Sequence, residues 1–450
     1  MSGAGVFAGE RFAVVGLGRN GAPVADALAA MGAAVWVWDD RAETRLASQH
    51  PILPEPFNLT RFTALVLSPG IPHLSAQAHR AAEAARGAGV PIVSDAELLY
   101  RATRRRGSKA RFVGVTGTNG KSTTTALLQH ILVSAGRESA AGGNLGVASL
   151  ALPALGDDGV YVLEMSSYML ERLTSLRFDV ACLLNLSPDH IDRHGDMAGY
   201  AAAKRHVFDR QTAAETAVLG IDDPATAGMA EGLAGRVVLV SGERAADLWC
   251  DAGMLRDGDG PIMTMADAPA LPGAHNAQNA AAAAAMAMAL GVTRDEIAAG
   301  IGSFPGLAHR QQLVAVIDGV KWVNDSKATN ADAAARALAC YERIVWIAGG
   351  TTKDGGIEAL APFFPRVLHA LLIGRDAPSL SSTLRKSGVK FTMSGTLEAA
   401  VASARSMVKR LGAEVVLLSP ACASFDQFSS FEARGDRFAE LARAGKKPSA

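Results

Sequence analysis

The sequence lacks the features that mark disulfide-rich, zinc-binding and membrane-spanning proteins. Only four of its 450 residues are cysteines, and because none form a CxxC spacing they offer neither a disulfide framework nor a zinc site. They are Cys182, Cys250, Cys340 and Cys422, which we expect to pack inside a protein of a reducing compartment. No stretch of about 18 unbroken apolar residues occurs, and Glu10 and Arg11 interrupt the N-terminal region before an apolar signal core can form. We therefore expect a cytoplasmic protein with no membrane partner.

An excess of charge of either sign is also missing. The 44 basic side chains balance 44 acidic ones, so we expect no nucleic-acid partner and no attraction to anionic lipid. The only dense basic run covers residues 101–111, and we interpret it as a solvated linker between domains. At 450 residues the chain is too long for one ordinary core, which predicts two or three domains.

What is present centres on residues 111–125, which predict a strand, a glycine-bracketed loop and a helix. Main-chain N–H groups beside Gly117 and Gly120, the ammonium of Lys121 and the hydroxyl of Ser122 are the groups that bind nucleotide phosphates and Mg²⁺. The generic phosphate loop carries a glycine six residues before its lysine, where this chain has Val115, so the match is to a variant. A tight strand-to-helix connection is the alternative, and we favour an ATP-type site.

A second glycine motif lies near the N-terminus. A predicted strand from Phe12 to Val15 leads into a GxGxxG motif at residues 16–21, and Asp39 follows the next strand. This is the dinucleotide-binding fingerprint, yet a UDP-linked ligand also carries a pyrophosphate, so the motif does not name the nucleotide. A third strand, Ala64 to Leu67, ends in a turn that begins at Ser68.

Polar side chains follow several other predicted strands. Glu164 ends the strand from Val160 to Leu163 and is a candidate Mg²⁺ ligand; the alternative is a helix-start carboxylate that merely favours the helix dipole. Residues 185–194 place seven polar or ionisable side chains after another strand, including Asp189 and His190. Lys204 lies in a helical pattern that by itself predicts a surface lysine.

The remaining chain continues the same alternation of strands and helices. An alanine-rich helix runs to about Leu290, and residues 303–310 resemble a domain boundary. Beyond it, strands precede polar strings at residues 325–330, 349–353 and 419–428. Because parallel sheets bind ligands at the carboxyl ends of their strands, we predict an α/β protein of three doubly wound segments.

Taken together, these strings resemble the Mur ligases. The resemblance covers nearly the whole chain, from about Gly16 to Phe438, and the last two strings resemble the members that add D-glutamate. It rests on seven motifs, which are Thr116–Thr123, Glu164–Ser167, Asn185–His190, His275–Asn276, His309–Arg310, Asp325–Asn330 and Ser419–Phe428.

The resemblance implies three domains and a reaction. A Rossmann-like domain at 1–107 would bind the UDP end of the substrate, a P-loop ATPase-type domain with a mostly parallel sheet at 108–305 would bind ATP, and a Rossmann-like domain at 306–450 would bind the incoming amino acid and part of ATP. The implied enzyme is a monomer that uses ATP and two Mg²⁺ ions to join UDP-N-acetylmuramoyl-L-alanine to D-glutamate. The amide would form through an acyl phosphate and a tetrahedral intermediate in peptidoglycan precursor synthesis.

Site residues carry over from the resemblance by position. The implied ATP-binding residues are Gly117, Thr118, Asn119, Gly120, Lys121, Ser122, Thr123, Asn276, Asn279, Arg310 and Asp325. The implied substrate-binding residues are Gly18, Asp39, Arg41, Ser68, Pro69, Gly70 and Asn144, with Thr329, Lys353, Ser424 and Phe431 for D-glutamate. The implied catalytic residues are Lys121, Glu164, His190 and Lys204, and the implied metal ligands are Ser122, Glu164, His190 and a carbamylated Lys204. Asp189 and His190 are both candidates for the base that deprotonates the attacking amine.

Other functions are compatible with parts of the sequence. An NAD-dependent oxidoreductase would use the GxGxxG motif and Asp39, but it leaves the phosphate loop unexplained. A P-loop ATPase that acts as a switch has no use for the strings of the last segment. Within the family, ligases that add alanine, diaminopimelate or lysine, and the folylpolyglutamate synthases, would share the ATP site.

Overall fold

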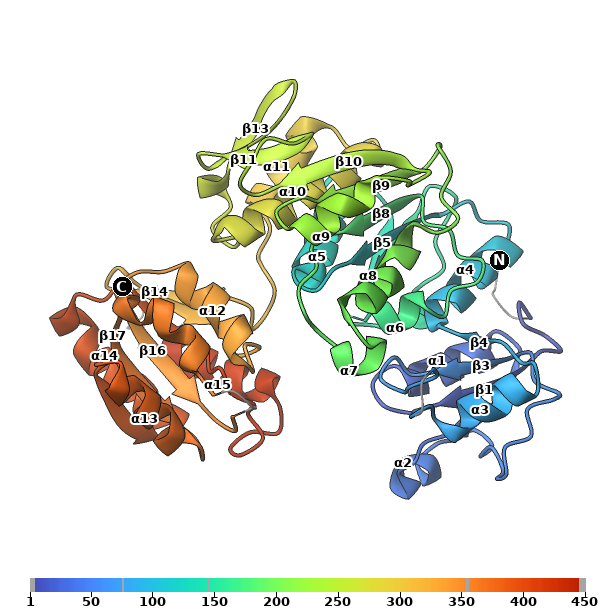
Figure 1. Ribbon diagram of the computed structural model, residues 1–450, viewed down its shortest axis with the longest axis horizontal. Helices are drawn as coiled ribbons and strands as arrows, with labels where there is room; N and C mark the ends of the chain where they lie inside the picture. Colours follow the sequence, from blue (N-terminus) through green and yellow to red (C-terminus); the bar gives the residue numbers. More distant parts are fainter. Residues whose placement is uncertain (1–4, 75–76, 145, 353–355, 445–450) are drawn as a thin grey trace. The chain divides into compact units, whose positions relative to one another are not determined.

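The computed structural model describes residues 5–74, 77–144, 146–352 and 356–444. It is an α/β protein with three sheets, as the sequence predicts (Figure 1). The chain forms two compact units, the first of residues 1–269 with 274–304 and the second of 270–273 with 305–450.

The N-terminal sheet has four parallel strands in the order β2-β1-β3-β4. Its strands are β1 (Arg11–Val15), β2 (Ala34–Trp38), β3 (Ala64–Leu67) and β4 (Ile92–Val93). Its helices are α1 (Gly21–Ala30), α2 (Ala42–Leu46), α3 (Arg80–Gly87) and α4 (Asp95–Arg105). Strand β1 lies between β2 and β3, so the GxGxxG motif, Asp39 and Ser68 all follow neighbouring strands at one sheet edge. This placement confirms the predicted positions of the first three strands.

The central sheet of the same unit has nine strands in the order β13-β12-β11-β10-β9-β8-β5-β7-β6. These are β5 (Arg111–Thr116), β6 (Ser139–Gly143), β7 (Val160–Glu164), β8 (Val180–Leu183), β9 (Thr216–Gly220), β10 (Arg236–Ser241), β11 (Leu248–Asp251), β12 (Met254–Asp257) and β13 (Gly260–Thr264). Strand β5 lies between β7 and β8, with Val115 opposite Glu164 on one side and Cys182 on the other. The phosphate loop therefore leaves the sheet beside Glu164 and the polar segment that follows β8. Strands β11 to β13 are antiparallel, which the sequence patterns do not predict.

Helices on this sheet carry the rest of the unit. They are α5 (Lys121–Ser134), η1 (Ser149–Ala151), α6 (Ser167–Leu170), α7 (Ile191–His194), α8 (Met197–Arg205), η2 (His206–Phe208), α9 (Pro224–Ala227), η3 (Gly228–Ala230), η4 (Met265–Asp267), α10 (Ala274–Ala289) and α11 (Arg294–Gly302). Helix α10 contacts α5 and the strands β8 to β11. Its alanines from 280 to 285 are all buried, because methyl side chains let a helix approach its neighbours closely. This confirms the predicted alanine-rich helix and places its first turn beside the phosphate loop.

The second unit has a six-stranded sheet in the order β14-β15-β19-β16-β17-β18, in which only β14 is antiparallel. Its strands are β14 (Gln312–Ile317), β15 (Val320–Asn324), β16 (Ile344–Gly349), β17 (Val367–Ile373), β18 (Phe391–Gly395) and β19 (Val415–Leu418). Its helices are α12 (Ala331–Ala339), η5 (Glu358–Arg366), α13 (Ala377–Lys386), α14 (Leu397–Leu411) and α15 (Phe431–Arg443). Because β19 lies between β15 and β16, the polar strings after these three strands meet at one edge.

The basic run at 101–111 is not a solvated linker, contrary to our interpretation of the sequence. It contains the last turn of α4 and the start of β5. Arg104 donates to the carbonyls of Ser108 and Ala110 over 2.8 and 3.0 Å, and Arg101 pairs with buried Glu97. Arg104 thus ties the last turn of α4 to the segment that leads into β5. In the described part of the chain, no helix is both long and apolar enough to cross a bilayer.

Candidate functional site

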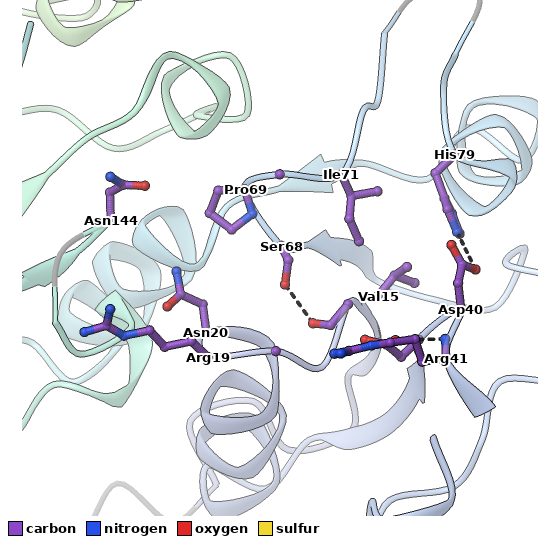
Figure 2. Close-up of a pocket in the computed structure, with 14 residues that line it drawn as sticks. Val15, Arg19, Asn20, Asp40, Arg41, Ser68, Pro69, Ile71, His79 and Asn144 are labelled. Carbon is purple, nitrogen blue, oxygen red and sulfur yellow. Dashed lines mark hydrogen bonds and ion pairs between the residues drawn. The ribbon is translucent and has the colours of Figure 1, made fainter. Parts of the chain in front are cut away.

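The N-terminal sheet edge carries a cleft of about 550 Å³ (Figure 2). Its lining includes every substrate-end residue that the sequence predicts in this region, namely Gly18, Asp39, Arg41, Ser68, Pro69, Gly70 and Asn144. It also includes residues that sequence reasoning missed, among them Arg19, Asn20, Asp40, Ile71 and His79. Arg19 and Asn20 are the variable positions of the GxGxxG motif, so the motif itself was a signal for them. The strand ends thus form one ligand-sized concavity.

Backbone and side-chain hydrogen bonds shape this cleft. The Asp39 carboxylate accepts from the N–H of Leu17 over 2.8 Å and from the N–H of Arg41 over 3.0 Å, so it joins the ends of β1 and β2. The Ser68 hydroxyl donates to the carbonyl of Gly16 over 2.7 Å, which joins β1 to β3. A Cβ at Gly21 would lie 1.7 Å from the same carbonyl oxygen, so only glycine lets helix α1 begin this close to the strand.

The phosphate loop joins β5 to α5. Gly117 and Gly120 both have positive φ, 147° and 84°. A residue with an L side chain would be strained in either backbone conformation. The Lys121 ammonium donates to the carbonyls of Gly117 and Thr118 over 2.8 Å each, so it curls back over the loop. Ser122 is buried and Thr123 half-buried in the first turn of α5. Val115, where the generic loop has glycine, is part of strand β5 and precedes the turn.

Two segments far apart in the sequence hold this loop in shape. The side chain of Asn185, after β8, accepts from the N–H of Asn119 over 2.9 Å and donates to its carbonyl over 3.2 Å. On α10, Asn279 accepts from the Thr124 hydroxyl over 3.2 Å and donates to Asn276 over 3.0 Å. The structure therefore brings both predicted asparagines of α10 to the phosphate loop.

Glu164 has the surroundings expected of a metal ligand. It is 2% exposed, and its Oε1 accepts from the Asn144 amide over 2.8 Å. Its Oε2 is buried and has no hydrogen-bond partner among the described residues. A buried carboxylate oxygen without a partner is costly, and a divalent cation would satisfy it. The donor set at this point fits Mg²⁺.

Lys204 is buried, although its helical pattern alone predicts a surface lysine. It is 2% exposed, and its Nζ donates to the carbonyl of Gly117 over 2.9 Å and lies 4.7 Å from the centre of the Tyr200 ring. Burial and then the nearby ammonium of Lys121 lower the pKa of Lys204 to about 6, against the attraction of Asp189 and Glu164. At pH 7 the amine of Lys204 is therefore largely uncharged, which is the form that reacts with CO₂.

His190 has a backbone in the left-handed region, with φ of 52°, at the start of α7. Its ring centre lies 5.2 Å from that of Tyr168, and its Nε2 lies 3.5 Å from Asp189. The side chains of His190 and Asp189 are both about half exposed, so they are accessible to a ligand. Across the described ranges, no group of three or more His, Cys, Asp or Glu side chains is gathered to hold a metal by itself. An ion here would need oxygen ligands from Ser122, a modified lysine or phosphate.

The second unit gathers a separate set of predicted residues. Asp325, after β15, accepts from the Ser419 hydroxyl over 2.7 Å and from the N–H of Gln311 over 3.1 Å. Burial raises the pKa of Asp325 to about 7, opposed by these bonds and by the charge of Arg310. Its carboxylate is thus a buried acceptor beside a half-buried guanidinium.

The residues predicted for the amino acid lie around the same sheet edge. Ser424 is 1% exposed, and its hydroxyl has no hydrogen-bond partner within the described portion of the chain. Phe431 begins α15, with its ring 6.1 Å from that of His309. Thr329 is half-buried just before α12. Lys353 lies outside the described residues.

Family profiles match two parts of the chain. One described as "Mur ligase middle domain" covers residues 115–287, and one described as "Mur ligase, glutamate ligase domain" covers residues 309–422. Full-length relatives are also similar. The UDP-N-acetylmuramoylalanine–D-glutamate ligase of Paramagnetospirillum magneticum is 49% identical over 97% of both chains, and that of Rhodospirillum rubrum is 46% identical over 98% of this chain and 97% of its own.

Solved structures share the fold at low sequence identity. The UDP-N-acetylmuramate-alanine ligase MurC of Thermotoga maritima matches with a TM-score of 0.62 at 17% identity, over 97% of this chain and 100% of its own. MurF of Acinetobacter baumannii matches with a TM-score of 0.59 at 18% identity, over 78% and 81% of the two chains. These likenesses concern the fold alone.

Proposed function

The chain belongs to the Mur ligase family, and on that premise we propose that it joins D-glutamate to UDP-N-acetylmuramoyl-L-alanine with hydrolysis of ATP to ADP and phosphate. Membership removes the oxidoreductase and switch alternatives. The choice of D-glutamate is supported by the full-length relatives, which carry that activity in their names. We place the reaction in the cytoplasmic stage of peptidoglycan precursor synthesis and expect a monomer.

One observation carries this proposal. Asn144 lines the nucleotide cleft of the N-terminal sheet and donates to Glu164, which ends the strand next to the phosphate loop. A long substrate whose UDP end occupies the cleft would bring its far end, the alanyl carboxylate, to the side of the loop. That is where the γ-phosphate of a bound ATP would lie.

The alanyl carboxylate must be activated before an amine can attack it. A carboxylate is a poor electrophile, so one of its oxygens first bonds to the γ-phosphorus as ADP leaves. The amine nitrogen of D-glutamate then attacks the carbonyl carbon, and the tetrahedral intermediate expels phosphate and loses a proton. Lys121 would neutralise the phosphoryl oxygens as negative charge moves between them. Candidate bases for the proton are Asp189 and His190.

Magnesium would supply charge neutralisation between two anions that must meet. We propose Ser122 and Glu164 as ligands of one ion and His190 with Lys204 as ligands of the second. An ammonium would repel the ion, so Lys204 would act as a carbamate formed from CO₂, and its buried amine with a pKa near 6 supports this.

The remaining candidate residues divide between ATP and D-glutamate. We propose that the loop residues 117–123 with Asn276 and Asn279 bind the phosphates of ATP, and that Arg310 and Asp325 contact its far end. For D-glutamate we propose Thr329, Lys353, Ser424 and Phe431. Three domains, at 1–107, 108–305 and 306–450, would each carry one of the three sheets.

Phosphate release tests the function directly. The full chain is mixed with ATP, Mg²⁺ and UDP-N-acetylmuramoyl-L-alanine, and D-glutamate is compared with L-glutamate, L-alanine and meso-diaminopimelate. We expect release that requires both substrates and is selective for D-glutamate. Release with a different amino acid would reassign the substrate, and no release with any would refute the proposal.

A further inference from the structure

A buried arginine connects the nucleotide cleft to the segment beside the phosphate loop. Arg172 follows α6 and is 2% exposed. Its guanidinium donates to the carbonyls of Leu67, Ser68 and Ile71 over 2.9, 3.2 and 2.5 Å. These carbonyls belong to the end of β3 and the turn after it, and Figure 2 shows Ser68 and Ile71 lining the cleft. One side chain of the segment after α6 therefore holds the turn that follows β3, which we name the cleft turn.

A second arginine meets the first at a histidine. His73 is 5% exposed, and its Nδ1 lies 3.2 Å from Nε of Arg172 and 3.1 Å from Nη2 of Arg193. Burial, with the charges of Arg172, Arg193 and Arg86, lowers the pKa of His73 to about 3, so its imidazole is neutral and Nδ1 accepts. Arg86 donates to the carbonyl of His73 and fixes its backbone.

Arg193 connects His73 to the region of α6 and α7. Arg193 lies in α7, three residues after His190, and its guanidinium lies 4.5 Å from the centre of the Tyr168 ring. Its Nη2 is 3.7 Å from Oε2 of Glu171, and the same carboxylate is 3.3 Å from Nδ1 of His194. Glu171 thus supplies the negative charge that faces the two arginines. The contacts therefore run without a break from the cleft turn through Arg172, His73 and Arg193 to α7, which begins just after the candidate metal ligand His190.

We propose that Arg172, His73 and Arg193, which we name the arginine bridge, position the cleft turn relative to helix α7, so that a substrate bound in the cleft presents its carboxylate to the phosphate loop. Arg172 and Arg193 are positioning residues, because neither lines the cleft, and they act on it through the cleft turn and His73. The guanidinium is suited to this task, since its planar fork can serve several carbonyls at once, whereas a lysine ammonium cannot match that geometry. The inference rests on the proposed function for the identity of the substrate.

A plain structural role is the alternative, in which the bridge only stabilises the fold. The two roles differ in what substitution changes. Loss of a fold contact lowers thermal stability and leaves substrate affinity alone, whereas loss of positioning raises the Kd and KM for the UDP-linked substrate selectively. Arg172→Lys keeps the charge and removes the fork. Arg104→Lys is the matched control, because Arg104 also donates to backbone carbonyls in this unit, but those of Ser108 and Ala110 do not belong to the cleft turn.

The test is calorimetric titration of the full chain with UDP-N-acetylmuramoyl-L-alanine in the absence of ATP, together with steady-state rates. We expect Arg172→Lys to raise the Kd and the KM for this substrate by about tenfold, with the KM for ATP within about twofold. Arg193→Lys should lower kcat as well, because it lies on the α7 side. Arg104→Lys should match the unaltered chain in all these constants.

The outcomes separate the inference from the function on which it rests. A folded Arg172→Lys chain with unchanged Kd overturns the arginine bridge, and so does an Arg172→Lys chain that cannot fold, because the residue would then be structural. Normal substrate binding without D-glutamate-dependent turnover overturns the proposed function and leaves the bridge to be judged by Kd. An unaltered chain that does not bind the substrate overturns both.

Discussion

The amide of Asn144 holds one oxygen of Glu164 and leaves the other buried and without a protein partner among the described residues. This relationship places a residue that lines the cleft of the N-terminal sheet in contact with the proposed metal ligand. It also orients the carboxylate before any ion arrives, as groups behind metal ligands commonly do.

Substitutions at this pair should change the dependence on Mg²⁺. Glu164→Ala should lower kcat by at least about 100-fold even at high Mg²⁺, because one ligand oxygen is lost. Asn144→Ala should raise the Mg²⁺ concentration for half-maximal rate by about tenfold, since the carboxylate loses its orienting bond. Phosphate release measured across a Mg²⁺ series checks both. A normal Mg²⁺ dependence in Glu164→Ala would refute the ligand role.

Lys121→Ala should abolish turnover with little effect on the fold. The ammonium donates to the carbonyls of Gly117 and Thr118 in its own loop, whereas phosphoryl transfer needs its charge. We expect a loss of at least about 100-fold in kcat and a change in Tm below about 2 °C. Exposed Lys109 offers the control, and Lys109→Ala should leave both quantities unchanged. An active Lys121→Ala enzyme would remove the phosphate-loop assignment.

Lys204 should cost the protein stability at neutral pH. Its pKa is about 6 in the fold and near 10.5 when exposed, so between these values the unfolded chain binds more protons and stability rises with pH. Lys204→Met should therefore raise Tm at pH 7 by at least about 3 °C in CO₂-free buffer, with a gain that shrinks toward pH 10. Scanning calorimetry at several pH values checks this. A gain that is independent of pH would contradict the lowered pKa.

The same residue tests the carbamate. Lys204→Ala should lose activity and regain part of it with added formate or acetate, because a small carboxylate can replace the oxygens of the carbamate. In the unaltered chain, ¹³C-labelled bicarbonate should give a carbamate signal that disappears in Lys204→Ala. Absence of both the signal and the rescue would leave an unmodified lysine.

Glu97 should govern acid unfolding of the first unit. Burial raises its pKa, but the bonds from the Ser175 hydroxyl and from the N–H groups of Leu176, Ser175 and Thr174 outweigh burial and lower its pKa to about 2. Its contribution is thus complete above about pH 4.5 and is lost as pH falls toward 2. Glu97→Gln should destabilise the unit by about 2 kcal/mol at pH 7 and much less near pH 2.

Urea unfolding at both pH values measures this difference. Exposed Glu83 provides the control, because Glu83→Gln removes a carboxylate without a buried bond network. If Glu97→Gln loses the same stability at pH 2 as at pH 7, the carboxylate is not the source of the effect.

Much of the fold could be predicted because its strands are short apolar runs that end in polar turns. The strand Ala64–Leu67 has the predicted bounds, and Glu164 lies at the predicted strand end. The three-sheet α/β class follows from that alternation. The antiparallel strands β11 to β13 could not be predicted, since their short runs carry no signal for direction.

Which charged side chains are buried is harder to predict from the sequence than where the strands lie. Lys204 has a surface-like helical pattern, and only the family resemblance indicated its role, because burial depends on which elements cover α8. The sequence carries no signal for the contact between Arg172 and His73, since 99 residues separate them and neither is part of a motif. Pairings of this kind depend on how sheets are placed, which local patterns do not encode.

The bond between Thr124 and Asn279 spans 155 residues. A Cβ at Gly120 would lie 2.3 Å from the Asn279 oxygen, so the turn and α10 fit against each other closely. On the ribosome, the phosphate loop is therefore synthesised long before its supporting helix. A nascent chain that has not yet extended past α10 carries the complete loop sequence without the surface that shapes it, so we expect nucleotide binding to begin only after α10 emerges.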